Sequence, residues 1–248
     1  MSEYQGKLDP EFEYVEMSFD GNAVVSENRH LRLSLLPTGL RTECWRYQFV
    51  KRLVDVVGAL LMSSIVLIPC LVVAALVSLT TQGPIFYREW RVGRAGRPFR
   101  IWKFRSMHIS NTWHEIATPR TSSHGVLLHW RVQKTGVDPR ITPIGQFLRK
   151  WSLDELPQLI NVLRGEMSLI GPRPVIEAEI PLYGQFRNFY LAAVPGLSGL
   201  WQVSGRSNVT FAKRAQLDAT YVQSWTLFGD FLILWRTIPA VLGRVGAR

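Results

Sequence analysis

The chain has only two cysteines among its 248 residues, Cys44 and Cys70, and the second lies inside an apolar run. Two such residues provide no disulfide framework, which excludes the disulfide-stapled secreted domains. The N-terminus also lacks the basic start and early apolar core of a secretory signal peptide, because it is acidic and no apolar core begins before residue 50. We therefore expect the body of the protein to face a reducing compartment.

Acidic residues are scarce in this basic chain except near its start. The net charge is +10, yet the first 27 residues hold seven acids against a single lysine. The remainder is therefore strongly basic, which predicts an anionic partner such as nucleic acid, anionic lipid or a phosphorylated substrate. Residues 1–44 show no sustained hydrophobic period, and we expect them to form a loosely ordered tail.

Charge is absent altogether from Val56 to Tyr87, a run of 32 positions. About 20 apolar residues cross a bilayer, so a simple transmembrane helix is one interpretation. Pro69 interrupts the run, however, and leaves two halves that are each too short to cross. Basic residues, which mark the cytoplasmic side, flank both ends. We therefore favour a re-entrant helix hairpin over residues 45–87, with a break at Pro69.

A ribbon of seven basic residues and one acid follows, between Arg88 and Arg105. Its glycines and its proline preclude one continuous helix, so the ribbon is expected to form a hairpin or an extended segment. The interleaved aromatic residues suit a membrane headgroup interface, although the stacking of nucleic-acid bases needs a similar mixture. Most of these arginines are expected only to hold anionic lipid. Lys103 and Arg105 are the better candidates for a specific site.

The segment 152–159 reads SLDELPQL and places Asp154 beside Glu155. Ser152 and Glu155 have the spacing of a capping box, but Pro157 would then fall at an unfavourable interior position. A cap at Asp154 would instead start a helix over about residues 155–163, with a glycine stop after it. Either way the carboxylates lie at a helix start, where phosphates also bind. The spacing alone leaves both a plain cap and a catalytic pair open.

Two later loops that contain glycine and proline each carry an arginine. The sequence GPRP at residues 171–174 fixes a loop that presents Arg173, whose planar guanidinium suits phosphate, although an ordinary turn is the alternative. The glycine-punctuated loop PGLSGLWQVSGR follows at residues 195–206. An apolar segment from Phe228 to Val241, interrupted by Pro239, indicates an interfacial helix or a core helix.

Four segments, taken in order, resemble the bacterial sugar transferases, the monotopic phosphoglycosyl transferases that act on polyprenyl phosphate. They are KFRSM from residue 103, DPRITPIGQFLRK from 138, SLDELPQLINVLRGEMSLIGPRP from 152 and PGLSGLWQVSGRSN from 195. The resemblance covers about residues 48–245 and is greatest to the short, exopolysaccharide-initiating members.

The resemblance implies a ping-pong reaction. An aspartate attacks a UDP-sugar, UMP leaves, and undecaprenyl phosphate takes the sugar phosphate from the enzyme. Asp154 matches the nucleophile, and Glu155 matches its partner at the Mg²⁺ site. Positions associated with phosphate handling are Lys103, Arg149 and Arg173. Further candidates for substrate binding are Arg105, Gln202 and Arg206. UDP-galactose or UDP-glucose is the expected donor.

Pattern and resemblance together predict an α-rich α+β monotopic membrane protein, with interfacial amphipathic helices around a small catalytic domain. The expected divisions are a tail (1–44), a re-entrant membrane hairpin (45–87) and an interfacial catalytic domain (88–248). We expect the bacterial inner membrane as its location, with the catalytic domain on the cytoplasmic face. Anionic lipid headgroups are expected partners, and a homo-oligomer is possible.

The sequence departs from the family in two places. Tyr87-Arg88-Glu89 stands where members often have Phe-Arg-Gln, and Ile68 replaces the serine that commonly precedes the proline of the break. The four histidines of residues 108–137 have no metal-ligand spacing, so no zinc site is expected there.

Two alternatives to a transferase are a nucleic-acid-binding protein and a non-catalytic membrane scaffold. The uncharged run argues against nucleic acid as a partner.

Overall fold

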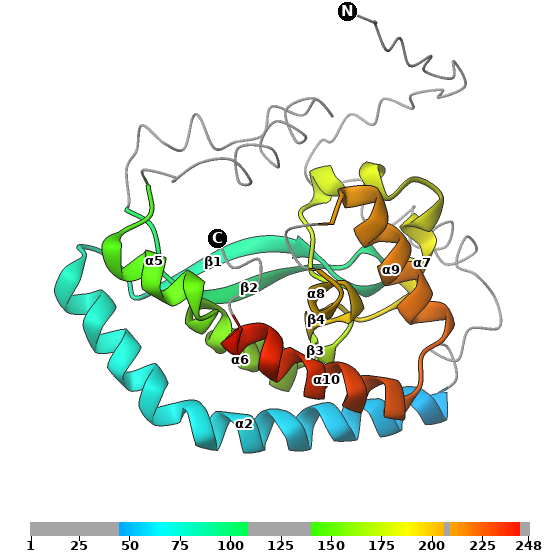
Figure 1. Ribbon diagram of the computed structural model, residues 1–248, viewed down its shortest axis with the longest axis horizontal. Helices are drawn as coiled ribbons and strands as arrows, with labels where there is room; N and C mark the ends of the chain where they lie inside the picture. Colours follow the sequence, from blue (N-terminus) through cyan, green and yellow to red (C-terminus); the bar gives the residue numbers. More distant parts are fainter. Residues whose placement is uncertain (1–44, 109–139, 206–208, 244–248) are drawn as a thin grey trace, which may run out of the picture. The chain divides into compact units, whose positions relative to one another are not determined.

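The computed structural model describes residues 45–108, 140–205 and 209–243, and all structural statements concern these residues (Figure 1). The predicted tail, Arg206 and three of the four histidines in segment 108–137 lie outside them, and the predicted domain boundaries stay predictions. The elements in chain order are α2 (Trp45–Thr80), β1 (Phe86–Val92), η2 (Arg94–Gly96), β2 (Pro98–Phe104), α5 (Pro143–Lys150), η3 (Leu153–Gln158), α6 (Leu159–Arg164), β3 (Ser168–Ile170), η4 (Glu177–Glu179), η5 (Pro181–Phe186), α7 (Arg187–Ala192), β4 (Gly196–Ser198), α8 (Leu200–Val203), α9 (Phe211–Gln223) and α10 (Leu227–Leu242). The mostly helical content with small sheets confirms the predicted α-rich α+β class.

The apolar run forms one continuous helix, α2, of 36 residues. At a rise of 1.5 Å per residue its length is about 54 Å. Pro69 lies inside it, and Figure 1 shows that the helix bends. Ser64 Oγ donates a hydrogen bond to the carbonyl oxygen of Leu60 at 2.8 Å, a bond that often accompanies bending. The predicted break at Pro69 is therefore a bend within one helix, since proline removes one hydrogen bond without ending the helix.

Both halves of α2 pack on the rest of the described chain. In its first half, the carboxylate of Asp55 accepts a hydrogen bond from the backbone N–H of Leu169 at 3.0 Å. In its second half, Val77 is fully buried in a cluster with Phe104 and Leu148. The two ends of the apolar helix are thus fixed to one body.

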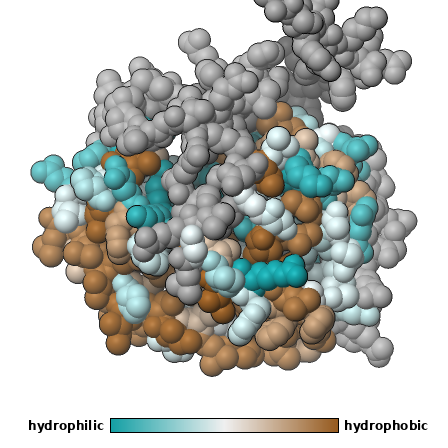
Figure 2. Space-filling model, viewed as in Figure 1, coloured by the Kyte–Doolittle hydropathy of each residue, from teal (hydrophilic) through white to brown (hydrophobic). Residues whose placement is uncertain are grey.

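The rest of the surface of α2 is apolar and exposed. Among the described residues, α2 is the one helix that is long and apolar enough to cross a membrane. Figure 2 shows its side chains as a hydrophobic band along the lower edge of the molecule. Large exposed members include Leu61, Ile65, Ile68, Leu71 and Leu79. An exposed apolar surface of this extent marks an interaction site or a membrane surface.

Helix α10 carries a second exposed apolar face. Phe228, Phe231, Trp235 and Ile238 follow one another at intervals of three and four residues, and each is more than half exposed. Ile233 lies on the other side of the helix and is buried in the core. This arrangement favours the interfacial helix over the core helix for residues 228–241.

The basic ribbon forms an antiparallel hairpin of β1 and β2, as the sequence predicted. Phe86 pairs with Phe104 at one end and Val92 with Pro98 at the other. The turn passes through Ala95 and Gly96, which both have positive φ. Its outer face carries arginines stacked on tryptophans, with Arg88 4.7 Å from the ring of Trp102.

The free edge of β2 is closed by the side chain of Asn161, which is fully buried in α6. Its Oδ1 accepts from the backbone N–H of Trp102 at 3.0 Å, and its Nδ2 donates to the carbonyl of Arg100 at 2.8 Å. Nδ2 also donates to the carboxylate of Glu166 at 2.6 Å. One amide thereby replaces a neighbouring strand and fixes β2 against the helix that follows Asp154.

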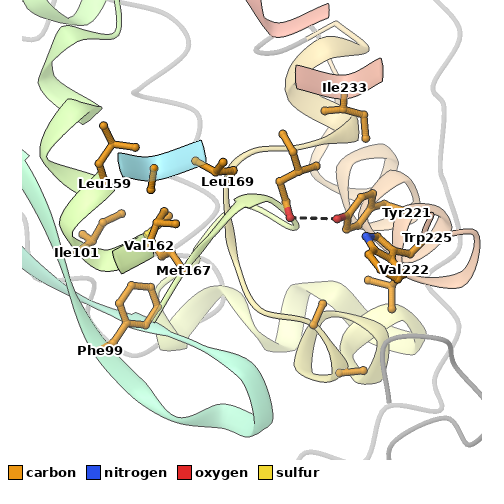
Figure 3. Packing of buried hydrophobic residues seen from close by; sticks show 14 residues of the cluster. Phe99, Ile101, Leu159, Val162, Met167, Leu169, Tyr221, Val222, Trp225 and Ile233 are labelled. Atoms are coloured by element: carbon orange, nitrogen blue, oxygen red, sulfur yellow. Dashed lines mark hydrogen bonds between the residues drawn. The ribbon is translucent and has the colours of Figure 1, made fainter. Parts of the chain in front are cut away.

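The main core lies between the hairpin and the C-terminal helices (Figure 3). Phe99 and Ile101 of β2 pack with residues of α6 and β3, and Trp225 and Ile233 extend the cluster towards α10. Tyr221 Oη lies 3.0 Å from the carbonyl oxygen of Ile170 (Figure 3). The core thus supports the strands and the short helix from which the polar residues of the next section project.

We predict that Asn161→Ala lowers the thermal midpoint of the detergent-solubilised protein, measured by tryptophan fluorescence. The substitution removes the partners of the Trp102 N–H and the Arg100 C=O, both in part-buried hydrogen bonds, and a group left unpaired there costs up to about 1–3 kcal/mol. Gln185→Ala is the matched control, because it truncates an exposed amide. Equal midpoints for the two variants would show that Asn161 does not hold the strand.

Candidate active site

The SLDELPQL segment forms the 3₁₀ helix η3 followed directly by α6. Ser152 adopts the left-handed conformation (φ 55°) and its side chain makes no cap hydrogen bond, so the capping box, one of the two alternatives, does not form. The other alternative, a single helix over about residues 155–163 capped by Asp154, is also corrected, because a 3₁₀ helix precedes α6. The helix was expected to stop at a glycine, and α6 does end at Gly165, whose φ is +80°. Asp154 is only 7% exposed and Glu155 follows it in the same turn.

Two cations from separate segments hold Glu155. Lys103 Nζ of β2 lies 3.2 Å from Glu155 Oε1, and Arg173 Nη2 of the loop after β3 lies 3.1 Å from the same oxygen. Burial raises the pKa of Glu155, but attraction to Arg173 and Lys103 outweighs it and lowers the pKa to about 2. Glu155 is therefore ionised at neutral pH.

Asp154 lies in the opposite electrostatic situation. Burial and repulsion from Glu155 raise its pKa above the ordinary value, although Lys103, Arg149 and Arg173 act to lower it. Arg149 was predicted to keep Asp154 ionised, and its charge does act to lower the pKa of Asp154, although desolvation has the larger effect on that pKa. Arg149 Nε donates to Ser106 Oγ at 3.0 Å, which fixes its guanidinium beside the site.

The loop that presents Arg173 is held by close backbone contacts. Gly171 N–H donates to the carbonyl of Ser198 at 2.9 Å, and Gly196 N–H donates to the carbonyl of Pro172 at 2.7 Å. A Cβ on Gly171 would lie 2.4 Å from the carbonyl oxygen of Val194, so only glycine permits this approach. The rigid presentation of Arg173 that the prolines suggested is thus supported by the β3–β4 pairing.

A buried polar network lies behind the same loop. Arg214 is 3% exposed, and its Nη2 lies 3.4 Å from the carbonyl oxygen of Arg173. Asp218 accepts a hydrogen bond from Tyr183 Oη at 2.8 Å, and its carboxylate lies 3.9 Å from Arg214 Nε. Burial raises the pKa of Asp218 to about 7, although Arg214 and Tyr183 act to lower it. This network was not predicted from the sequence.

A small pocket opens beside Glu155. Its lining residues are Arg91, Ile101, Lys103, Glu155, Gln158, Arg173, Pro174, Gly196 and Leu197. The predicted residues Lys103, Glu155 and Arg173 thus meet at one place, and the lining adds a third cation, Arg91. Such a surface suits a ligand that carries several negative charges, such as a diphosphate.

Two of the pocket residues, Arg91 and Gln158, were missed from the sequence. Arg91 was grouped with the arginines of the ribbon, because only the register of the hairpin relates its face in β1 to that of Lys103 in β2. Gln158 is 2% exposed, and its Nε2 has no hydrogen-bond partner among the described residues. A buried unpaired amide at a pocket wall is a donor that a ligand can satisfy.

The three residues predicted to bind substrate, Arg105, Gln202 and Arg206, are not found at this pocket among the described residues. Arg105 is buried and donates to the carbonyl oxygens of Thr81 and Gln82, at 2.8 and 2.7 Å, which ties it to the end of α2. Gln202 has a buried side-chain amide and, like Arg105, is not among the described residues that line the pocket. Arg206 lies outside the described residues. The placement of Arg105 favours a structural role over the predicted contact with substrate.

The residues present fit a magnesium ion only together with substrate. Among the described residues there is no group of three histidine, cysteine or acidic side chains that could hold a metal. Mg²⁺ is typically bound through one or two carboxylates together with substrate phosphates. Asp154 and Glu155 supply such carboxylates next to a pocket for phosphate, so the donor set is compatible with the ion.

The chain is similar to several known proteins. The model of the family "Bacterial sugar transferase" matches residues 46–244. The UDP-galactose-lipid carrier transferase of Erwinia amylovora is 47% identical over 201 residues, which are 81% of this chain and 42% of that protein. The exopolysaccharide production protein ExoY of Sinorhizobium fredii is 47% identical over 193 residues, 77% of this chain and 84% of that protein. A third relative, the UDP-glucose:undecaprenyl-phosphate glucose-1-phosphate transferase of Caulobacter vibrioides, is 39% identical over 77% of this chain and 69% of its own length. The chain therefore spans less than half of some relatives and most of others, and it belongs to the bacterial sugar transferase family.

Proposed function

We propose that the protein transfers a sugar 1-phosphate from a UDP-sugar to undecaprenyl phosphate and so begins the assembly of an exopolysaccharide or a related glycoconjugate. The observation that carries the proposal is the pair Asp154 and Glu155, where one carboxylate is held by two cations and the other is desolvated beside it. The names of the relatives support a galactose or glucose donor.

In the first step, a carboxylate oxygen of Asp154 attacks the sugar-bearing phosphorus. A bond forms between that oxygen and phosphorus, the bond from phosphorus to the bridging oxygen breaks, and its electron pair leaves with UMP. Desolvation makes the ionised carboxylate of Asp154 a stronger nucleophile, while Lys103, Arg149 and Arg173 offset the charge of the phosphates. Mg²⁺ bound at Glu155 would supply further charge neutralisation.

In the second step, a phosphate oxygen of undecaprenyl phosphate attacks the same phosphorus, and Asp154 leaves as a carboxylate. The acceptor is a membrane lipid, so the site must lie at the level of the headgroups. Helix α2 supports this placement because it exposes a long apolar surface while both of its halves remain attached to the catalytic domain. We propose a re-entrant α2 in the inner membrane, with the domain on the cytoplasmic face.

Asp154→Asn should abolish the covalent intermediate. Full-length wild-type enzyme mixed with labelled UDP-galactose or UDP-glucose, without lipid, is expected to retain the label after denaturation. The Asn variant is expected to retain none, because a neutral amide is a poor nucleophile. Asp154→Glu should also lose about 100-fold in rate, because the extra methylene displaces the attacking oxygen by about 1 Å. Glu177→Gln, a change of an exposed acid, is the control. An Asn variant that still accumulates the labelled adduct would remove Asp154 from the mechanism.

The rate of UMP release should fall as the pH drops through the raised pKa of Asp154, because protonation removes the nucleophile. Glu155→Gln removes the nearby negative charge and releases Lys103 and Arg173, and both changes lower the pKa of Asp154. We therefore expect the acid limb of the kcat profile to move to lower pH in this variant, although its maximum falls because Mg²⁺ binds less well. Excess Mg²⁺ should restore part of the rate. A limb that stays in place or moves to higher pH contradicts the assignment.

The re-entrant arrangement predicts that both ends of α2 are protected from the outside. A chain with Cys44 and Cys70 replaced by serine would receive a single cysteine at Tyr47 or at Arg97, both exposed positions. A membrane-impermeant maleimide should label neither site in intact spheroplasts and both after permeabilisation. Labelling of one site in intact spheroplasts would establish a simple crossing.

A further inference from the structure

Arg91 enters the pocket from the same face of the hairpin as Lys103. In the β1–β2 register Arg91 pairs with Phe99, and Glu89 pairs with Ile101. Directly paired residues share a face and alternate residues repeat it, so these four residues and Lys103 all project inward. Phe99 and Ile101 are buried in the core, which fixes this face against the domain.

The guanidinium of Arg91 is oriented by its own strand. Its Nη2 is paired with the carboxylate of Glu89, and its Nη1 lies 3.4 Å from the carbonyl oxygen of Trp90. The side chain of Arg91 is 14% exposed and that of Glu89 is 37% exposed. A guanidinium has five N–H donors, so donors remain for an anion in the pocket. Glu89 stands where the family often has glutamine, and here it supplies a charged partner.

Arg91 lies further along the hairpin than the lysine that contacts Glu155. It pairs with Phe99, four residues before Lys103 in β2, which is about 13 Å along the strand. Lys103 Nζ lies 3.2 Å from Glu155, the neighbour of Asp154. A UDP-sugar carries two phosphorus atoms. Only the sugar-bearing one must reach Asp154, while the other departs with the uridine. The cation further along the hairpin is therefore placed for the second phosphate.

Gln158 provides a neutral donor at the same pocket. Its side chain is 2% exposed, and Nε2 is buried without a hydrogen-bond partner among the described residues. Gln158 belongs to the same 3₁₀ helix as Asp154, one turn further along the chain. An orphaned amide N–H held in this way gains a full hydrogen bond when an anionic oxygen arrives.

We propose that Arg91, oriented by Glu89, binds the phosphate of the leaving uridine nucleotide, and that Gln158 donates a second hydrogen bond to it. When the phosphoanhydride bond breaks, its electron pair and the new negative charge stay on the departing UMP, where these donors stabilise them. The inference rests on the proposed ping-pong reaction, and it assigns a residue pair to the phosphate of the leaving nucleotide.

The test compares Arg91→Gln with Arg88→Gln in full-length protein in a neutral detergent. Both variants lose one charge from β1, but Arg88 stacks on Trp102 on the opposite face of the hairpin. Enzyme loaded from UDP-galactose or UDP-glucose is given labelled UMP, and the reverse formation of UDP-sugar is followed. We expect Arg91→Gln to raise the UMP concentration for half-maximal exchange about 10- to 100-fold. Arg88→Gln should stay within about twofold of wild type. Gln158→Met should raise the concentration about 3- to 10-fold.

The thermal midpoint of each variant, measured by tryptophan fluorescence, is the internal control. We expect Arg91→Gln to keep the wild-type midpoint, which a merely structural defect would not allow. Calorimetric titration with UMP gives the same comparison of affinities if loading becomes too slow. Unchanged UMP affinity, equal effects of the two arginine variants on UMP affinity, or a midpoint that falls in Arg91→Gln but not in Arg88→Gln would each overturn the inference. A wild-type chain that forms no adduct would overturn the proposed function together with it.

Discussion

The two ion pairs of Glu155 join three segments that are far apart in the sequence. Lys103 comes from a hairpin strand, Glu155 from a 3₁₀ helix and Arg173 from a glycine–proline loop, and both contacts fall near 3 Å. A carboxylate this enclosed is stabilised only while both cations remain in place. Other residues hold the backbone that carries each cation. The Asn161 amide binds the edge of β2, which carries Lys103, and Arg214 Nη2 contacts the carbonyl oxygen of Arg173.

The same arrangement makes two adjacent carboxylates chemically unequal. Glu155 takes the direct contacts with Lys103 and Arg173, so Asp154 is left with burial and with the repulsion of its neighbour. Two interacting acids titrate as a pair, and the environment pushes their pKa values apart. Such a separation allows one carboxylate to remain an anion that binds cations and the other to serve as the group that forms and breaks a covalent bond.

Much of the site could be predicted because its residues fall in motifs, whereas side-chain direction could not. Lys103 and Arg105 are separated by one residue, yet Lys103 reaches Glu155 while Arg105 turns to the end of α2. Arg91 was missed for the converse reason, since it was one of several arginines until the register of the hairpin assigned it a face. The capping box failed because Ser152 adopts a left-handed conformation, which no local spacing reveals.

The bend in α2 is related to the contacts that the two ends of this helix make with the rest of the protein. Arg52 donates to the carbonyl oxygen of Leu163 at 2.7 Å, Lys51 pairs with Asp230 at 2.7 Å, and Asp55 is bound to β3. A helix that crossed the bilayer from this end would have to carry its other end, with Val77, about 30 Å away from the domain. Val77 is buried against that domain, which supports the proposed re-entrant helix. The bend in α2 lets one helix keep both attachments and still expose an apolar middle, and Pro69 removes one backbone hydrogen bond, which permits the bend. In the proposed reaction, the same geometry keeps a site for a water-soluble nucleotide sugar within reach of a lipid phosphate.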